Sequence, residues 1–169
     1  MRSSSTPWAF VLVIAAAAGF VWLTGQRMPP LVAAHFGVTG AANGYMARPS
    51  YLKFMMVFVV LLPLALTVAM GWALRIPGAR INLPDRDYWL APERRTATIA
   101  VLLQYMRVFG TALVVFLCYV HWLVVQANDV QPPALDNRWM VGGLLIFLAL
   151  VIGWTVALRR RFRREESVS

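Results

Sequence analysis

The stretch FMMVFVVLLPLALTVAMGWAL, residues 54–74, contains no charged side chain. A helix needs about 20 predominantly apolar residues to cross the hydrocarbon core of a bilayer. This stretch is therefore predicted to be a membrane-spanning helix. Pro63 lies in its middle and is expected to kink the helix, because proline removes one main-chain hydrogen bond.

Three further apolar runs flank this stretch along the chain, at about residues 8–23, 101–125 and 139–158. Hydrophobic residues make up 60% of the 169 residues and charged residues 14%, whereas about a quarter of a typical soluble protein is charged. The predicted fold class is an all-α integral membrane protein, with four transmembrane helices in a single membrane domain over residues 1–169. The first run is short and follows Arg2, so a cleavable signal peptide is the alternative interpretation there.

The basic residues predict the orientation of the four spans. Eleven of them lie in segments on one side of the membrane: Arg2, Arg75, Arg80, Arg86, Arg94, Arg95, Arg159, Arg160, Arg161, Arg163 and Arg164. The other side carries only Arg27, Arg48, Lys53 and Arg138. Because cytoplasmic loops are enriched in Lys and Arg, both termini are expected to be cytoplasmic, with 159–169 as a basic cytoplasmic tail. Loops 24–53 and 126–138 are then extracytoplasmic.

Small residues recur four positions apart in three of the spans. The sets are Ala15 and Gly19, then Ala65, Ala69 and Ala73, then Ala149, Gly153 and Ala157. A spacing of four places each set on one helix face, where small side chains let helices approach closely in lipid. We therefore expect these faces to pack together in a compact four-helix bundle.

The first outer loop contains the polar insert HFGVTGAANGYMARP, residues 35–49. Its glycines and Asn43 tolerate the positive φ angles that tight turns require. The insert is expected to be a compact, turned loop rather than a strand or a helix, and to cap the outer ends of the first two helices.

The order His35, Phe36, Gly40, Asn43, Gly44, Tyr45 and Arg48 resembles the signature of the bacterial membrane family carrying the domain of unknown function catalogued as 1648. The resemblance covers residues 27–75. It departs from the family at Asn43, where an aspartate is usual, and at Ala42, where proline is frequent. Two further stretches, NLPDRDYWLAPERR at 82–95 and HWLVVQAN at 121–128, are similar to a bacterial subgroup that carries this domain in a four-span chain.

This resemblance implies a multi-pass protein of the bacterial inner membrane. Most members of the family have no assigned activity. Some larger relatives are immunity proteins against secreted toxic peptides, or signal the presence of such peptides.

Candidate residues for binding a ligand or partner combine the insert with polar positions of the third span. They are His35, Phe36, Gly40, Asn43, Gly44, Tyr45, Arg48, Arg107 and His121. On the third span, Arg107 and His121 share one arc of the helix with Gln104, Thr111 and Cys118. Polar groups inside a span face a partner or a cavity, so this stripe is either an interhelical contact or the lining of a pocket.

The two histidines, His35 and His121, are both expected near the outer surface. With a carboxylate such as Asp129 they could bind a divalent metal. The alternative is that each histidine anchors the loop through hydrogen bonds.

The connection between the second and third spans combines charges with aromatic side chains beside the membrane. Pro92 and Glu93 suit the first turn of a helix, so the third helix is expected to begin near residue 92 and to project beyond the hydrocarbon. The candidates for docking a cytoplasmic partner are Asp85, Asp87, Tyr88, Trp89, Glu93, Arg94 and Arg95. Anchoring of this loop in lipid headgroups is the alternative interpretation.

The sequence lacks a phosphate-binding glycine loop, a nucleophile elbow and an HExxH pair. Its basic residues cluster at the ends of spans and not in one polar patch, which argues against a nucleic-acid partner. The predicted function is a non-catalytic binding, sensing or envelope-accessory module that uses the loop 35–49, without a cofactor. Its expected partners are the lipid bilayer and a membrane protein or peptide. The alternatives are an immunity-type protein against membrane-active peptides, and a metal-binding membrane enzyme or carrier using His35 and His121.

Overall fold

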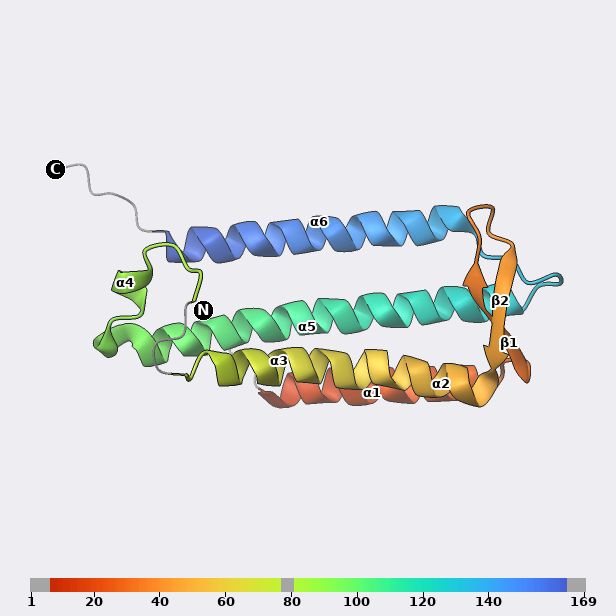
Figure 1. Cartoon of the computed structure of the whole chain (residues 1–169), viewed down its shortest axis with the longest axis horizontal. Helices are drawn as coiled ribbons and strands as arrows, with labels where there is room; N and C mark the ends of the chain where they lie inside the picture. Colours follow the sequence, from red (N-terminus) through yellow and green to blue (C-terminus); the bar gives the residue numbers. More distant parts are fainter. Residues whose placement is uncertain (1–6, 77–80, 164–169) are drawn as a thin grey trace.

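The computed structural model describes residues 7–76 and 81–163. Four helical spans in it are long and apolar enough to cross a membrane: Pro7–Gly25, Arg48–Ala73, Pro92–Asn128 and Asn137–Phe162. They run side by side (Figure 1). The prediction of a multi-pass membrane protein with four spanning helices is thereby confirmed, although the helices extend beyond the apolar runs at several ends. Arg2, Arg80 and residues 164–169 of the predicted basic tail lie outside the described residues.

The elements follow one another in a simple order. They are α1 (Pro7–Gly25), β1 (Leu31–Phe36), β2 (Ala42–Ala47), α2 (Arg48–Met56), the π-helical turn η1 (Val57–Leu61), α3 (Leu62–Ala73), α4 (Arg86–Trp89), α5 (Pro92–Asn128) and α6 (Asn137–Phe162). Helix α5 begins at Pro92, as the proline and the following Glu93 predict.

The insert between the first two spans folds as a β-hairpin, so the expectation of an all-α chain with an irregular loop here is wrong. Strands β1 and β2 pair in antiparallel fashion. Residues along β2 alternate between half-buried and exposed, because one face packs on the bundle and the other faces outward. Gly40, at φ 84°, supplies the left-handed turn that reverses the chain.

The second span is one continuous rod made of α2, η1 and α3. The π-helical turn ends immediately before Leu62 and Pro63. A proline ring clashes with the carbonyl group four residues earlier in a regular α-helix, and the wider turn at 57–61 accommodates this ring. Where the sequence predicts a kink at Pro63, the structure has a local π-helical turn.

Helix α5 is the centre of the molecule. Helices α1 and α3 pack against it, and α6 packs against it from another side (Figure 1). Phe162 is the only buried residue of α6. The expected compact four-helix bundle is therefore a three-helix core of α1, the second span and α5, with α6 attached through α5.

The period-four sets of small residues do not form the helix contacts expected from the sequence. Every member, from Ala15 and Gly19 in α1 to Ala157 in α6, is exposed on the surface of the helices. The close approaches use other glycines instead. A Cβ atom on Gly110 would lie 2.9 Å from the Phe10 ring, and one on Gly143 would collide with the Tyr119 ring.

The two ends of the molecule differ in character (Figure 1). We call the end with β1, β2 and the connection 129–136 the hairpin end. We call the opposite end the basic end, because its described residues include Arg75, Arg86, Arg94, Arg95, Arg159, Arg160, Arg161 and Arg163.

Candidate functional site

The hairpin end holds most of the residues that the sequence singles out. Its hairpin is irregular, because His35 pairs with Gly44 and Phe36 with Ala42. This register leaves Ala34 on β1 and Asn43 on β2 as extra residues in two bulges. Bulges re-aim side chains locally, and both His35 and Asn43 are exposed. A Cβ atom on Gly44 would lie 2.7 Å from the His35 Cβ, so glycine is needed opposite the histidine.

The hairpin is fixed to α5 by one buried side chain, Asn128. Its Oδ1 accepts a hydrogen bond from the Ala33 main-chain N–H (2.8 Å), and its Nδ2 donates to the Ala33 carbonyl (2.9 Å) and to the Val124 carbonyl (2.8 Å). Two hydrogen bonds from one amide therefore hold the outer edge of β1 against the helix, and the third, to Val124, lies within α5. Asn128 ends the stretch 121–128 but is not among the predicted binding residues; its place at the end of a long apolar run was the available signal.

The turn of the hairpin is held by the connection between α5 and α6. The Leu135 N–H donates to the Gly40 carbonyl (2.8 Å), and the Asn137 side chain donates to the Val38 carbonyl (2.6 Å). An isolated antiparallel β-bridge between Ala41 and Ala134 adds to this contact. The two loops at the hairpin end thus form one connected cap.

Beneath the cap, His121 is completely buried between α1, α2 and α5. Its ring stacks on Tyr51 at a centroid separation of 5.6 Å and meets Phe20 edge-on. Both ring nitrogens are engaged: Nδ1 lies 2.8 Å from the Tyr51 hydroxyl, and Nε2 lies 2.8 Å from the Thr24 hydroxyl. The sequence analysis missed Thr24 and Tyr51, which lie at the ends of apolar runs.

The direction of these hydrogen bonds can be assigned. The Thr24 hydroxyl donates to the Phe20 carbonyl (2.6 Å), so it accepts from Nε2–H of His121. A neutral imidazole has one donor and one acceptor, and Nδ1 therefore accepts from the Tyr51 hydroxyl. Every polar hydrogen of the cluster is satisfied with His121 uncharged, and the cluster joins α1, α2 and α5.

The predicted metal-binding set is not assembled. His35 and Asp129 are exposed, whereas His121 is buried with both nitrogens engaged. Within residues 7–76 and 81–163, no group of three His, Cys, Asp or Glu residues is placed to hold a metal ion.

The remaining motif residues divide into two groups. Phe36 packs into the core, and the Arg48 guanidinium donates to the carbonyls of Gln26 (2.9 Å) and Met28 (2.8 Å), which fixes the chain after α1. Together with Gly40 and Gly44, these residues build the cap. His35, Asn43 and Tyr45 instead present their side chains outward.

The polar stripe of α5 is half-buried along most of its length, through Gln104, Arg107, Thr111 and Cys118. The Nε atom of Arg107 is buried without a hydrogen-bond partner among the described residues. His121, at the hairpin end, belongs to a connected polar cluster with Thr24 and Tyr51.

The residues proposed for docking at the basic end are largely used inside the molecule. Trp89 donates to the Phe162 carbonyl (2.6 Å), Arg95 donates to the Leu74 carbonyl (3.1 Å), and Arg94 lies over the Tyr88 ring (4.0 Å). These contacts attach α4 and the start of α5 to the ends of α3 and α6. Asp85, Asp87 and Glu93 remain exposed on this segment.

No family model, curated protein or solved structure matches this chain. The resemblance to the 1648 domain therefore rests on the motif residues alone. Functional conclusions must come from the geometry of the chain itself.

Proposed function

We propose that this protein is a non-catalytic, multi-pass binding module of the bacterial inner membrane, which recognises an extended peptide segment along strand β2 on its extracytoplasmic side. The observation that carries this proposal is the outward edge of β2, a row of main-chain groups on a rigid cap.

The distribution of arginine supports the proposed orientation. The basic end carries eight described arginines, whereas the hairpin end carries Arg27, Arg48, Lys53 and Arg138. Because basic residues tend to be retained in the cytoplasm, this distribution supports a hairpin outside the cell, where a secreted or envelope peptide can reach it.

The pairing of the hairpin defines which main-chain groups face outward. Ala33 directs its N–H and C=O to Asn128, away from β2. Opposite residues in an antiparallel ladder point their main-chain groups the same way, either toward each other or away. Tyr45, the partner of Ala33, therefore directs its N–H and C=O to the free edge of β2, and Ala47, the partner of Leu31, directs its N–H there.

This edge lacks the features that usually prevent pairing with another strand. Natural edge strands are often protected by charged side chains or proline, and β2, with the sequence ANGYMA, contains neither. Within the described residues, no turn or side-chain hydrogen bond reaches the main chain of Tyr45 or the N–H of Ala47, whereas the Ala47 carbonyl caps helix α2. An added strand satisfies such groups and gains affinity from the main chain, while alternate side chains provide specificity. His35, Asn43 and Tyr45 are available for that second role.

Ala47 allows a direct test of this edge. Its φ of −59° matches the angle that proline imposes, so Ala47→Pro deletes one outward N–H without distorting the strand. Peptides are first selected from a displayed library on the protein in nanodiscs, with empty nanodiscs for counter-selection. Ala47→Pro should lower the affinity of the protein for the selected peptides about three- to tenfold, because one hydrogen bond contributes about 1 kcal/mol.

Ala47→Val is the matched control, because it adds side-chain volume at the same exposed position and keeps the N–H. It should bind the selected peptides as the unchanged protein does. Equal affinity for Ala47→Pro and Ala47→Val, or failure to select any peptide over empty nanodiscs, contradicts recognition at this edge. Separately, His35→Ala and Asn43→Ala should leave the abundance of the protein unchanged and remove cellular tolerance to a membrane-active peptide if the immunity role holds.

A further inference from the structure

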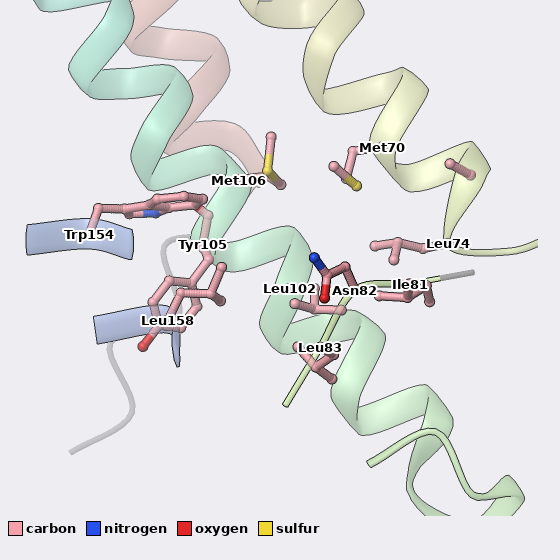
Figure 2. Close-up of a pocket in the computed structure, with 11 residues that line it drawn as sticks. Met70, Leu74, Ile81, Asn82, Leu83, Leu102, Tyr105, Met106, Trp154 and Leu158 are labelled. Atoms are coloured by element: carbon pink, nitrogen blue, oxygen red, sulfur yellow. The ribbon is translucent and has the colours of Figure 1, made fainter. Parts of the chain in front are cut away.

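An apolar groove lies toward the basic end of the molecule, between three helices (Figure 2). It has a volume of about 330 Å³. Its main walls are Met70 and Leu74 on the second span, Leu102 and Met106 on α5, and Trp154 and Leu158 on α6. This groove is separate from the hairpin and its proposed peptide edge.

The groove exists because α6 is attached on one side only. Helices α3 and α6 both pack along α5, but they do not pack along each other. The space between α3 and α6 is therefore open beside α5. At the basic end it is closed by the segment 81–83, where Leu83 packs with Leu74, Leu102 and Phe162.

Two polar side chains face the groove among these apolar walls. The amide of Asn82 projects into it, and Tyr105 lines it beside Trp154 and Leu158 (Figure 2). Neither the Asn82 amide nor the Tyr105 hydroxyl makes a hydrogen bond within the described residues. Both can therefore donate to an oxygen-rich ligand.

Arginines directly follow two of the residues that line the groove at its basic end. Arg75 directly follows Leu74, and Arg159 directly follows Leu158; both are exposed, and their guanidinium groups make no ion pair among the described residues. Arg95 lies against the Leu74 and Ile76 carbonyls at the end of α3. The apolar groove thus lies next to a set of positive charges at the basic end.

We propose that this groove binds an acyl chain of an anionic phospholipid, whose phosphate lies at Arg75 and Arg159. Basic pockets between transmembrane helices bind the headgroups of anionic lipids, and a slot that opens sideways between two spans is entered from the hydrocarbon. The Asn82 amide and the Tyr105 hydroxyl serve the ester and phosphate oxygens.

Trp154 provides a direct probe, because it forms part of the wall. The protein is reconstituted with phosphatidylglycerol or phosphatidylcholine brominated on the acyl chains, and tryptophan quenching is compared. Brominated phosphatidylglycerol should quench more strongly, and Trp154→Phe should remove this excess. Equal quenching by the two lipids, or an excess that persists in Trp154→Phe, overturns the proposal.

Two double variants test the contribution of the arginine charges separately from that of the groove. Arg75→Gln with Arg159→Gln should reduce the preference for phosphatidylglycerol about thirtyfold, since each of the two basic residues contributes about 1 kcal/mol near an anionic surface. The matched control, Arg27→Gln with Arg138→Gln, removes the same charge at the hairpin end and should leave the preference unchanged. An equal loss of the phosphatidylglycerol preference in both double variants shows a general charge effect and rejects this site.

Ala73→Phe fills the groove without changing any charge, because Ala73 lines it. Ala69→Phe, on the same helix but outside the groove, is its control. The excess tryptophan quenching by brominated phosphatidylglycerol should disappear in Ala73→Phe and persist in Ala69→Phe. An unchanged excess in Ala73→Phe contradicts acyl-chain binding in the groove, even if the arginine variants behave as expected.

Discussion

Fully buried at the junction of α1, α2 and α5, His121 is accommodated by a chain of hydrogen bonds with a single direction. Donation runs from Tyr51 to His121, from His121 to Thr24, and from Thr24 to the Phe20 carbonyl. A buried polar group that loses its partner is destabilising. The cluster therefore stabilises the contacts of α5 with both neighbours at the hairpin end.

Replacing His121 with phenylalanine tests this role. His121→Phe keeps a ring that can stack on Tyr51, but leaves the Tyr51 hydroxyl and the Thr24 acceptor without their partner. We expect a loss of about 1–2 kcal/mol in the free energy of unfolding, measured in detergent or bicelles. His35→Ala, at the other histidine, is the control and should change stability by less than about 0.5 kcal/mol because His35 is exposed. Equal effects at the two histidines contradict the assigned cluster.

The loop motif illustrates what sequence can predict at the level of single residues. Turn-forming residues and a change from apolar to polar composition were enough to mark residues 35–49 as a distinct unit. The sequence could not separate Phe36 and Arg48, which hold the cap together, from His35 and Asn43, which face outward. That separation depends on two bulges, and the positions of bulges follow from the pairing of both strands.

Among the elements, α6 depends most on a single contact surface. Along α5 it is held by a stack of Phe116 on Phe147, by a hydrogen bond from Trp154 to the Tyr105 carbonyl (2.9 Å), and by Tyr119, which packs against Gly143. The Tyr119 hydroxyl also donates to the Trp139 carbonyl (2.6 Å).

Two adjacent glycines of α6 make a matched pair of tests. A Cβ atom at Gly143 would collide with the Tyr119 ring, whereas nothing lies within 4 Å of a Cβ atom at Gly142. Gly143→Ala should therefore weaken the attachment of α6 and lower the midpoint of thermal unfolding. Gly142→Ala should leave that midpoint unchanged or raise it, since alanine favours helix by up to about 1 kcal/mol over glycine. A similar fall in both variants argues against the Gly143–Tyr119 contact.

The helices were predictable because a long apolar run needs no knowledge of its neighbours. The hairpin was not, because its strands have only six residues each and its bulges interrupt the alternation of apolar and polar positions. The period-four small residues also misled the packing prediction. The pattern identifies a helix face correctly, but it does not show whether that face meets another helix or lipid.

For the molecule as a whole, the orientation in the membrane decides what each end can meet. Cys118→Ser removes the one cysteine of the sequence. A new cysteine is then introduced into this background, either by Asn43→Cys or by Arg163→Cys. A membrane-impermeant maleimide applied to intact cells should label Asn43→Cys strongly and Arg163→Cys only after lysis, because arginine-rich segments stay in the cytoplasm. The reverse pattern would place the hairpin inside the cell and rule out recognition of an external peptide.

The overall arrangement was predictable only in part. Hydropathy indicated how many times the chain crosses the membrane and that its described ends share one side of the bundle. It did not indicate that α5 is the shared partner of every other span, because that depends on side-chain contacts such as those of Gly110 with Phe10 and of Gly143 with Tyr119.

The π-helical turn at Val57–Leu61 has a consequence for chain length. A π turn closes its hydrogen bonds over five residues, against four in an α-helix, so it contains one residue more than the same turn of regular helix. Buried positions Met55, Val59 and Pro63, four residues apart, consequently lie near one line along this turn. A homologue that is one amino acid shorter at 57–61 and has no proline at position 63 can thus form an uninterrupted α-helix and keep both halves in the same rotational setting.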